Sequence, residues 1–389
     1  MRIIGETNIP FLSYRKIALS ISALLLIAGF AYIAAGPGLN LGIDFVGGTQ
    51  VTVKFRQAPD LDRLRGAVSE ITSGTPEIQR FDEAEKNEVL IRVENPGDME
   101  GDFTKPILDA LHAEYDVAIG DAFDINTQGS SELLDLIVAA DPEKVVGDVE
   151  SREAYYEPQA EAVFEQRKRQ GIFNSPDELL TIEGVNPETA EFMKRTVGIG
   201  DFALLGAESV GPTVGADLQS KAKLAIGFSL VGMLVYIWLR FQLPYGIGAV
   251  AALFHDVLMA LTALALTHRE INLPTIAAIL TLVGYSVNDT VVVFDRVREN
   301  LRLHRGQALE GLMNTSINQT LSRTLITSGT TLMVVLSLYL FGGDVINTFA
   351  FVLLVGIIVG TYSSVFVAAP VALWVNRILA ARRRAKQRR

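Results

Sequence analysis

Four ionisable residues lie inside long apolar stretches of the chain, away from their extreme ends. His255 and Asp256 are neighbours in one stretch, and Asp289 and Arg323 occupy two others. Placing such a side chain inside a membrane costs about 2.5 to 3.5 kcal/mol on insertion scales, so each one marks a candidate functional site. Ionisable groups in this setting are typical of proton pathways in pumps and transporters.

Asp289 and Arg323 are predicted to reach a similar depth on two successive helices that run in opposite directions. Asp289 follows Asn288, and Arg323 stands near the start of the next apolar stretch. Burial favours the neutral form of a carboxyl group, whereas a nearby guanidinium favours the charged form. The pair could therefore load and release a proton as its separation changes. A static ion pair that only ties the two helices together is the alternative.

His255 and Asp256 form the second candidate pair. They either belong to the same proton pathway or form a local hydrogen-bonded polar patch between helices. The apolar stretch that contains Arg323 is also rich in hydroxyls between Ser322 and Thr331. Those hydroxyls can support a chain of water molecules, although close helix packing is their commoner use.

Six apolar stretches are long enough to carry these groups across a membrane. A spanning helix needs about 20 mainly apolar residues, because about 30 Å of hydrocarbon is crossed at 1.5 Å per residue. The stretches cover residues 17–35, 222–239, 244–267, 271–293, 318–341 and 346–375. A hydrophobic content of 49% and a mean hydropathy of +0.30 also argue against an ordinary soluble enzyme. The first stretch is longer than the apolar core of a signal peptide, so we expect it to be retained.

Basic residues near the ends of the stretches predict the orientation. Lys and Arg gather at both ends of the chain and on the connections that would face the cytoplasm. We therefore predict a cytoplasmic N-terminus at 1–16, a cytoplasmic link at 294–317 and a basic cytoplasmic tail at 376–389. From Arg296 to Gln319 basic and apolar residues alternate, which predicts an amphipathic helix on the membrane surface.

Residues 36–221 are predicted to form an exported domain. The range 36–215 holds 35 of the 44 Asp and Glu residues but 15 of the 34 Lys and Arg residues. Hydrophobic periodicity predicts strands and helices in the order of a ferredoxin-like α+β fold. The strands are expected at 49–56, 76–81, 88–94 and 203–210, and the helices at 61–71 and 103–114.

A helix-rich lobe at about 127–202 is predicted to interrupt this domain before its last strand. It contains the phrase LLTIEGVNPETAEFM, which indicates two short helices around a glycine hairpin. Hairpins of this form contact nucleic-acid phosphates elsewhere, but strongly acidic surroundings repel phosphates. We therefore expect a structural hairpin and no nucleic-acid partner.

Several classes of function are excluded by what the sequence lacks. There is no cysteine, which excludes disulfides, thiolate metal sites and cysteine nucleophiles. No GxxxxGK[ST] loop indicates nucleotide use, and no HExxH pattern indicates a metalloprotease. The segments FHDV and FGGD fit no known setting of an intramembrane protease. We therefore expect no enzyme activity and no cofactor, with protons as the coupling ion.

Six segments of the sequence together resemble the SecF family. They read GIDFVGGT at 42–49, VGPTVGADL at 210–218, YIWLRF at 236–241, HDV at 255–257, GYSVNDTVVVFDRVREN at 284–300 and LSRTLITSGTT at 321–331. SecF is the smaller membrane partner in the bacterial SecDF protein-export complex, with six transmembrane helices in a resistance-nodulation-division-type half-repeat. The likeness covers the helices and the ends of the exported domain. It does not cover 127–202, where SecF proteins usually have no such lobe.

This resemblance implies roles for particular residues. Asp289 and Arg323 match the proton pathway of the family, and Asp256 matches its polar site in the third helix. The full candidate pathway is Asp289, Arg323, Asp256, Asn288 and His255. The two glycine-rich segments imply a structural motif made of Gly42, Asp44, Gly47, Gly48, Gly211, Pro212 and Gly215.

The resemblance also implies a location, partners and a function. It implies a protein of the bacterial inner membrane whose partners are SecD, the SecYEG channel, an unfolded polypeptide in transit and membrane lipids. The expected function is to use the proton-motive force with SecD for late translocation through SecYEG. A charge that crosses the membrane releases about 2.3 kcal/mol per 100 mV, which can bias a domain movement. The alternatives are a proton-coupled exporter of small molecules or lipids, and a passive scaffold that recruits SecD to the channel.

Overall fold

The computed structural model divides the chain into two compact units. The helical unit comprises Met1–Gly42 and Leu218–Arg389, and the α+β unit comprises Ile43–Asp217. The structure describes residues 7–36, 38–72, 76–80, 87–94, 102–115, 119, 122–304 and 306–387. The outermost parts of the predicted cytoplasmic termini, 1–6 and 388–389, lie outside the described residues.

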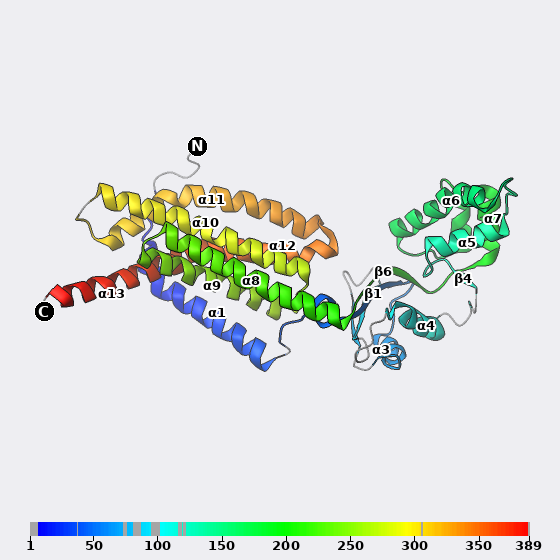
Figure 1. The fold of residues 1–389 in the computed structure, drawn as a ribbon, viewed down its shortest axis with the longest axis horizontal. Helices are drawn as coiled ribbons and strands as arrows, with labels where there is room; N and C mark the ends of the chain where they lie inside the picture. Colours follow the sequence, from blue (N-terminus) through cyan, green and yellow to red (C-terminus); the bar gives the residue numbers. More distant parts are fainter. Residues whose placement is uncertain are drawn as a thin grey trace. The chain divides into compact units, whose positions relative to one another are not determined.

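Six helices in the described part of the chain are long and apolar enough to cross a membrane, as the sequence predicts (Figure 1). The first five are α1 (Arg15–Ala35, after the short η1 at Phe11–Tyr14), α8 (Pro212–Arg240), α9 (Leu243–Leu266), α10 (Leu273–Leu303) and α11 (Leu309–Phe341). The last span is built from α12 (Gly343–Ser363), the π segment η4 (Ser364–Ala368) and α13 (Ala369–Gln387). The chain therefore has the helices of a multi-pass membrane protein.

The starts of α9 and α10 follow from their sequences. Pro244 and Pro274 each stand in the first turn of their helix, where the missing N–H leaves no hydrogen bond unmade. Asn272 precedes α10, and its side-chain oxygen accepts a hydrogen bond of 3.0 Å from the backbone N–H of Thr275. These caps fix where α10 begins and therefore which of its residues face the other helices.

The centre of the helical unit is formed by α9, α10 and the last span. Half of the apolar window of each is buried inside the unit, whereas α1, α8 and α11 bury a much smaller part of theirs. Leu253, Phe294 and Ala368 are fully buried in this core. Polar residues on the inner faces of these central helices are therefore kept away from lipid.

The predicted amphipathic surface helix between Arg296 and Gln319 is absent from the described residues of this region. Instead, α10 continues to Leu303 and α11 begins at Leu309. The side-chain amide of Asn300 donates to Ser316 Oγ at 2.8 Å and to Gln319 Oε1 at 2.9 Å. The alternating pattern that predicted a membrane-surface helix instead marks the faces on which two extended helix ends pack together.

The α+β unit contains the predicted ferredoxin-like sheet. Its strands are β1 (Gly48–Phe55), β2 (Glu77–Arg80), β3 (Glu88–Val93) and β6 (Phe202–Val210), and its two helices are α3 (Leu61–Ser69) and α4 (Thr104–Tyr115). The strand order is β2-β3-β1-β6, and every neighbouring pair is antiparallel. Residue 81, the predicted end of the second strand, lies outside the described residues.

Alternating apolar residues hold this sheet against its helices. Val51 and Val53 point to the buried face of β1, and they pack with Leu64 of α3 and Leu111 of α4. The side chain of Asp60 caps α3 by accepting a hydrogen bond of 2.9 Å from the backbone N–H of Asp62. Period-two burial in the strand and helical burial in α3 and α4 thus meet in one core.

A helix-rich lobe with a core of its own lies between α4 and β6. Its elements are β4 (Phe123–Asp124), α5 (Ser130–Ala140), α6 (Val149–Gln170), η3 (Pro176–Thr181), α7 (Pro187–Thr196) and β5 (Val197–Gly198). Tyr156, Phe173 and Leu179 are fully buried in this core. Gly184, with φ +91°, makes the turn between η3 and α7, which are the two short helices of the predicted hairpin.

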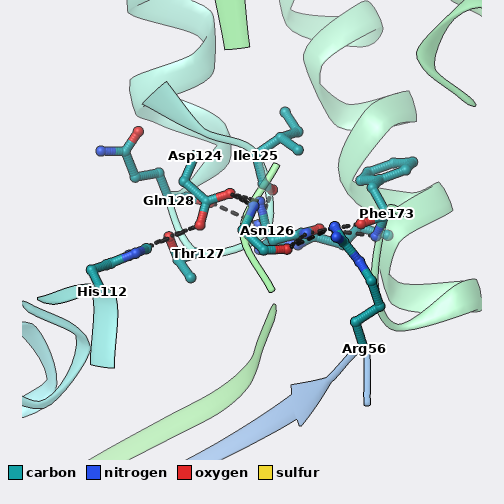
Figure 2. Close-up of polar contacts among 10 residues, drawn as sticks. Arg56, His112, Asp124, Ile125, Asn126, Thr127, Gln128 and Phe173 are labelled. Atoms are coloured by element: carbon teal, nitrogen blue, oxygen red, sulfur yellow. Dashed lines mark hydrogen bonds and ion pairs between the residues drawn. The ribbon is translucent and has the colours of Figure 1, made fainter. Parts of the chain in front are cut away.

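Asn126 joins the lobe to the sheet (Figure 2). Its side-chain amide donates to the carbonyl oxygens of Phe173 at 3.0 Å and Gly200 at 3.2 Å, and its Oδ1 accepts from the N–H of Phe173 at 2.9 Å. The backbone oxygen of Asn126 accepts from the N–H of Leu204 in β6 at 2.9 Å. One buried side chain thus holds the start of the lobe, its far loop and the last strand together.

Arg167 and Asp124 complete the junction. Arg167 donates to the carbonyl oxygens of Ile125 at 2.7 Å and Gln128 at 2.9 Å, and burial lowers the pKa of its guanidinium to about 10. Asp124 accepts from the hydroxyl of Thr127 at 2.8 Å, and burial raises the pKa of its carboxyl group. Both charged groups are therefore held by neutral hydrogen-bond partners in a partly desolvated site.

Candidate functional site

Asp256 is fully buried between three helices. Its Oδ2 accepts hydrogen bonds from Ser286 Oγ of α10 at 2.5 Å and from Ser363 Oγ at the end of α12 at 2.7 Å. Its Oδ1 lies 2.8 Å from Nδ1 of its neighbour His255. Two hydroxyls and one imidazole therefore satisfy the carboxyl group inside the bundle.

His255 is buried beside Asp256, and one of its two ring nitrogens makes no hydrogen bond to a described residue. Among the residues that the structure describes, Nε2 has no hydrogen-bond partner. The ring lies 6.3 Å from the ring of Tyr362, whose hydroxyl donates to the carbonyl oxygen of Ala18 in α1 at 2.8 Å. An unsatisfied buried nitrogen costs free energy, so this position favours a water molecule or a transferable proton.

Asp289 is the second buried carboxyl group, with an exposed fraction of 2%. Its Oδ2 accepts a hydrogen bond from Ser328 Oγ of α11 at 3.0 Å. Thr361 of α12 in turn places its Oγ1 2.9 Å from the oxygen of Ser328. The hydroxyls around Asp289 thus come from both neighbouring helices.

Arg323 and Asn288 do not enter this buried cluster. Both side chains are exposed on the outer surface of the helical unit. In the described chain no ion pair of 4.0 Å or less joins Arg323 to Asp289, although the guanidinium is close enough to act electrostatically on the carboxyl group. The predicted ion pair is therefore not formed here. Arg323 is exposed, whereas Thr324, about 100° further around the helix, is buried.

Ser286, Thr361 and Ser363 contribute to the cluster and were not among the sequence-predicted residues. Serine and threonine are common in membrane helices, where their usual role is close packing. No spacing rule singles out these three, because their partners lie on other helices. The one available signal was the hydroxyl-rich face of α11, which contains Ser328.

Further buried hydroxyls line the same helices without partners. In the part of the chain that the structure describes, the side-chain oxygens of Tyr285, Thr290, Ser322 and Thr324 are buried and make no hydrogen bond. Buried polar groups of this kind are normally satisfied by internal water. The arrangement is thus suited to holding water between α10 and α11 and to passing protons along it.

No group of three or more His, Asp or Glu side chains placed to hold a metal ion occurs among the described residues. The buried oxygens of Asp256 and Asp289 instead meet hydroxyl donors at hydrogen-bond distances. The chemistry that these groups support directly is proton binding.

The glycine-rich segments form a close-packed crossing in the α+β unit. Gly47 has φ +75°, and a side chain there would meet Cα of Pro212 at 2.9 Å. Gly48 has φ +135° and approaches the carbonyl oxygen of Val93, while Gly215 lies against the backbone of Gly47. The short helix α2 (Ile43–Val46), which contains Asp44, leads into this crossing, and Gly211 accepts from the N–H of Gly215 at 2.9 Å.

Gly42 belongs to the helical unit. Its N–H donates to the carbonyl oxygen of Ile271 at 2.8 Å, and a Cβ there would collide with the carboxylate of Glu270. The structure thus divides the predicted glycine motif between two local packing sites.

The sequence matches two family models. Residues 190–378 match the family described as protein export membrane protein SecD/SecF, C-terminal, and residues 32–59 match the SecD/SecF GG motif. The second match contains Gly42, Asp44, Gly47 and Gly48. The first contains both buried carboxyl groups.

Curated relatives align over almost the whole chain. The protein translocase subunit SecF of Koribacter versatilis is 42% identical over 95% of this chain and 92% of its own length. The SecF of Desulfurispirillum indicum is 37% identical over 93% of this chain and 90% of its own length. These aligned ranges include residues 127–202, which differs from the expectation that the likeness stops at the lobe.

Solved structures show the same fold. The chain is similar to a crystal structure of SecDF, a translocon-associated membrane protein, from Thermus thermophilus, with 27% identity and a TM-score of 0.63. That match covers 95% of this chain and 39% of the SecDF chain. A structure of SecDF in a super-membrane-facing form matches with 27% identity, a TM-score of 0.53, and coverage of 99% and 41%. The chain thus spans about two fifths of the SecDF chains that it matches.

Proposed function

The chain belongs to the SecF family of protein translocase subunits, and we propose that it uses the proton-motive force, together with SecD, to promote protein export. In this proposal Asp289 and Asp256 bind the coupling protons, with His255 beside them. The chain acts without a cofactor and without enzyme activity. The energy scale is adequate, because one charge crossing the membrane releases about 2.3 kcal/mol per 100 mV.

The observation that carries the proposal is the way in which Asp289 is held. The carboxyl group is buried and bonded to Ser328, with no ion pair to Arg323 among the described residues. A hydroxyl can accept from a protonated carboxyl group or donate to a charged one. An ion pair with Arg323 would stabilise only the charged form of the Asp289 carboxyl group. The hydroxyl environment therefore supports a proton carrier over a static bridge between helices.

The outward-facing side chains of Asn288 and Arg323 support a helical partner. Both are exposed on the unit's own surface within apolar helices, where contact with lipid would be costly. We infer that SecD covers this face of α10 and α11. The likeness to part of a longer SecDF chain supports this inference, because the remainder of that chain would lie beside it.

The proposal includes a location and further partners. We place the protein in the bacterial inner membrane with both termini in the cytoplasm and the α+β unit in the periplasm, in contact with lipids. Its other partners would be the SecYEG channel and an unfolded polypeptide in transit. The Lys and Arg residues at both chain ends support this orientation.

Replacing Asp289 by Asn tests the proposal in vesicles that contain SecD and SecYEG. We expect loss of proton flux and a large loss of late translocation, with SecD still bound in a pull-down. Asp295→Asn is the matched control, because it removes a carboxylate from the same helix where it pairs with Arg240 outside the cluster. Unchanged flux and export in Asp289→Asn would leave a passive scaffold as the function. Loss of small-molecule or lipid efflux with normal protein export would instead favour a small-molecule exporter.

A further inference from the structure

Two hydroxyls of α12 each contact one of the two buried carboxyl sites. Ser363 donates to Asp256, and Thr361 reaches Asp289 through Ser328. Residues two apart on a helix differ by about 200°, so these side chains leave α12 on opposite sides. α12 packs against α9, α10 and α11, and it therefore lies between the two sites.

Both hydroxyls have a second acceptor on their own helix. Ser363 Oγ lies 2.7 Å from Oδ2 of Asp256 and 3.2 Å from the carbonyl oxygen of Gly360. Thr361 Oγ1 lies 2.9 Å from Ser328 Oγ and 2.8 Å from the carbonyl oxygen of Ile357. A hydroxyl carries one hydrogen and can donate to one acceptor at a time. The choice of acceptor thus depends on whether the nearby carboxyl group is charged.

A second connection between the sites runs along α10. Ser286, which donates to Asp256, stands three residues before Asp289. Residues at this spacing are neighbours on one helix face, with about 5 to 6 Å between Cβ atoms. The two carboxyl sites therefore share α10 as well as α12.

We propose that Asp256 and Asp289 bind protons as a coupled pair, with Ser363 and Thr361 as the positioning residues that connect them. When Asp256 gains a proton, it donates to Ser363, which turns its own hydrogen to the carbonyl oxygen of Gly360. When Asp289 gains a proton, it donates to Ser328, which donates in turn to Thr361. The hydrogen of Thr361 then turns to the carbonyl oxygen of Ile357. This change at α12 alters the hydrogen bonds that the other site can make. The inference rests on the proposed proton transport and adds that its two proton sites interact.

Among the described residues, the other titratable groups near the two sites are His255 on α9, Tyr285 on α10 and Tyr362 on α12. Arg323 on α11 acts on Asp289 from the outer surface of the unit. From α1 the site receives the uncharged hydroxyl of Ser22, which lies 3.1 Å from that of Tyr362. The coupling between Asp256 and Asp289 is therefore measured in variants that leave all of these neighbouring groups unchanged.

Infrared titration of the full chain in lipid nanodiscs tests the proposal. The carbonyl bands of protonated carboxyl groups are followed against pH, and Asp256→Asn and Asp289→Asn assign them. In Asp256→Asn we expect the titration midpoint of Asp289 to move by about one pH unit or more, the scale at which two sites titrate as a pair. Of the two carboxyl groups, Ser363 contacts only Asp256, and Ser363→Ala should also move the midpoint of Asp289.

Two further variants separate coupling from general distortion of α12. Ser364→Ala is the matched control, because its hydroxyl donates to the carbonyl oxygen of Thr361 and to neither carboxyl group. It should leave both bands unchanged. In the Asp256→Asn background, Ser363→Ala should have no further effect on Asp289, as a double-mutant cycle requires.

Three results would overturn the inference. An Asp289 midpoint that is the same in the wild type and in Asp256→Asn refutes coupling but leaves Asp289 as a proton carrier. An Asp289 band that never titrates in the wild type refutes the proposed function as well. An effect of Ser363→Ala on Asp289 that persists without Asp256 shows distortion of α12 and refutes the positioning role.

Discussion

The guanidinium of Arg323 is exposed on α11, whereas the carboxyl group of Asp289 on neighbouring α10 is buried against Ser328. The two residues that were expected to pair thus face different surroundings, one outside the unit and one inside it. The carboxyl group can change its protonation state without breaking an ion pair. Arg323 instead faces the surroundings of the helical unit, where we propose that SecD binds.

Replacing Arg323 by Gln tests this division of roles. We expect SecD binding to fall by about tenfold, which corresponds to about 1.4 kcal/mol, because a charge facing the partner is lost. Arg323→Lys should retain part of the binding. Thr330→Val is the control, since this exposed hydroxyl of α11 donates to the backbone of its own helix. Equal SecD binding in Arg323→Gln and wild type, measured by quantitative pull-down, would contradict the prediction.

Ser328→Ala should disable Asp289 without removing it. A hydrogen bond to a charged group contributes about 1.5 to 3 kcal/mol, so we expect proton flux in vesicles to fall by about tenfold or more. Thr327→Val is the matched control, because Thr327 donates to the backbone oxygen of Arg323 and not to the carboxyl group. If both variants lower the flux equally, the effect comes from α11 as a whole.

Gly47→Ala should destabilise the α+β unit. The residue has φ +75°, and a Cβ would come within 2.9 Å of Cα of Pro212. We expect a loss of about 2 kcal/mol or more in thermal unfolding. Gly66→Ala in α3 has open space around the added Cβ and should instead stabilise by about 0.5 to 1 kcal/mol. Similar melting temperatures for the two variants would show that the fold does not require glycine at position 47.

Asn126→Ala should loosen the lobe from the sheet. The change leaves the backbone N–H and carbonyl oxygen of Phe173 without their partner in a buried site, and each unsatisfied group costs about 1 to 3 kcal/mol. The carbonyl oxygen of Gly200 loses the hydrogen bond from Asn126 but keeps the one from Arg56. Limited proteolysis of the full chain should then cut the lobe much faster. Gln128→Ala, two residues along and exposed (Figure 2), should behave like the wild type. Equal cleavage rates for Asn126→Ala and wild type would mean that other contacts suffice.

The raised pKa of Asp124 makes stability depend on pH at this junction. Burial raises the pKa above the ordinary value of 3.8, so the folded chain holds this proton more tightly than the unfolded chain does. The resulting stabilisation is complete below about 3.8 and is lost as the pH rises through the folded-state pKa. We expect Asp124→Asn to remove this part of the pH dependence in calorimetric melts. Parallel curves for the variant and wild type would contradict it.

Most of the fold follows from hydrophobic periodicity. The six spanning helices and the order of strands and helices in the α+β unit were all predicted, because long apolar runs and period-two alternation are local signals. The expected surface helix between Arg296 and Gln319 was wrong, since an amphipathic face can cover another helix as readily as a membrane. The hydrophobic pattern of a segment alone does not show whether its apolar face packs against lipid or against another helix.

The candidate site could be predicted only in part. Asp256, His255 and Asp289 were found because ionisable residues are rare in apolar helices. The hydroxyls of Ser286 and Ser363 were missed, since their role depends on which helices pack together. The direction of Arg323 was also not predictable, because a shift of one position, about 100° around the helix, decides whether a side chain faces inward or outward.

The π segment η4 begins directly after Ser363. A π turn closes its hydrogen bonds over five residues instead of four, so it widens the last span immediately after Ser363, the residue that donates to Asp256. Single π turns inside α-helices occur frequently at functional sites. The irregular backbone of the last span thus coincides with one of the two buried carboxyl sites.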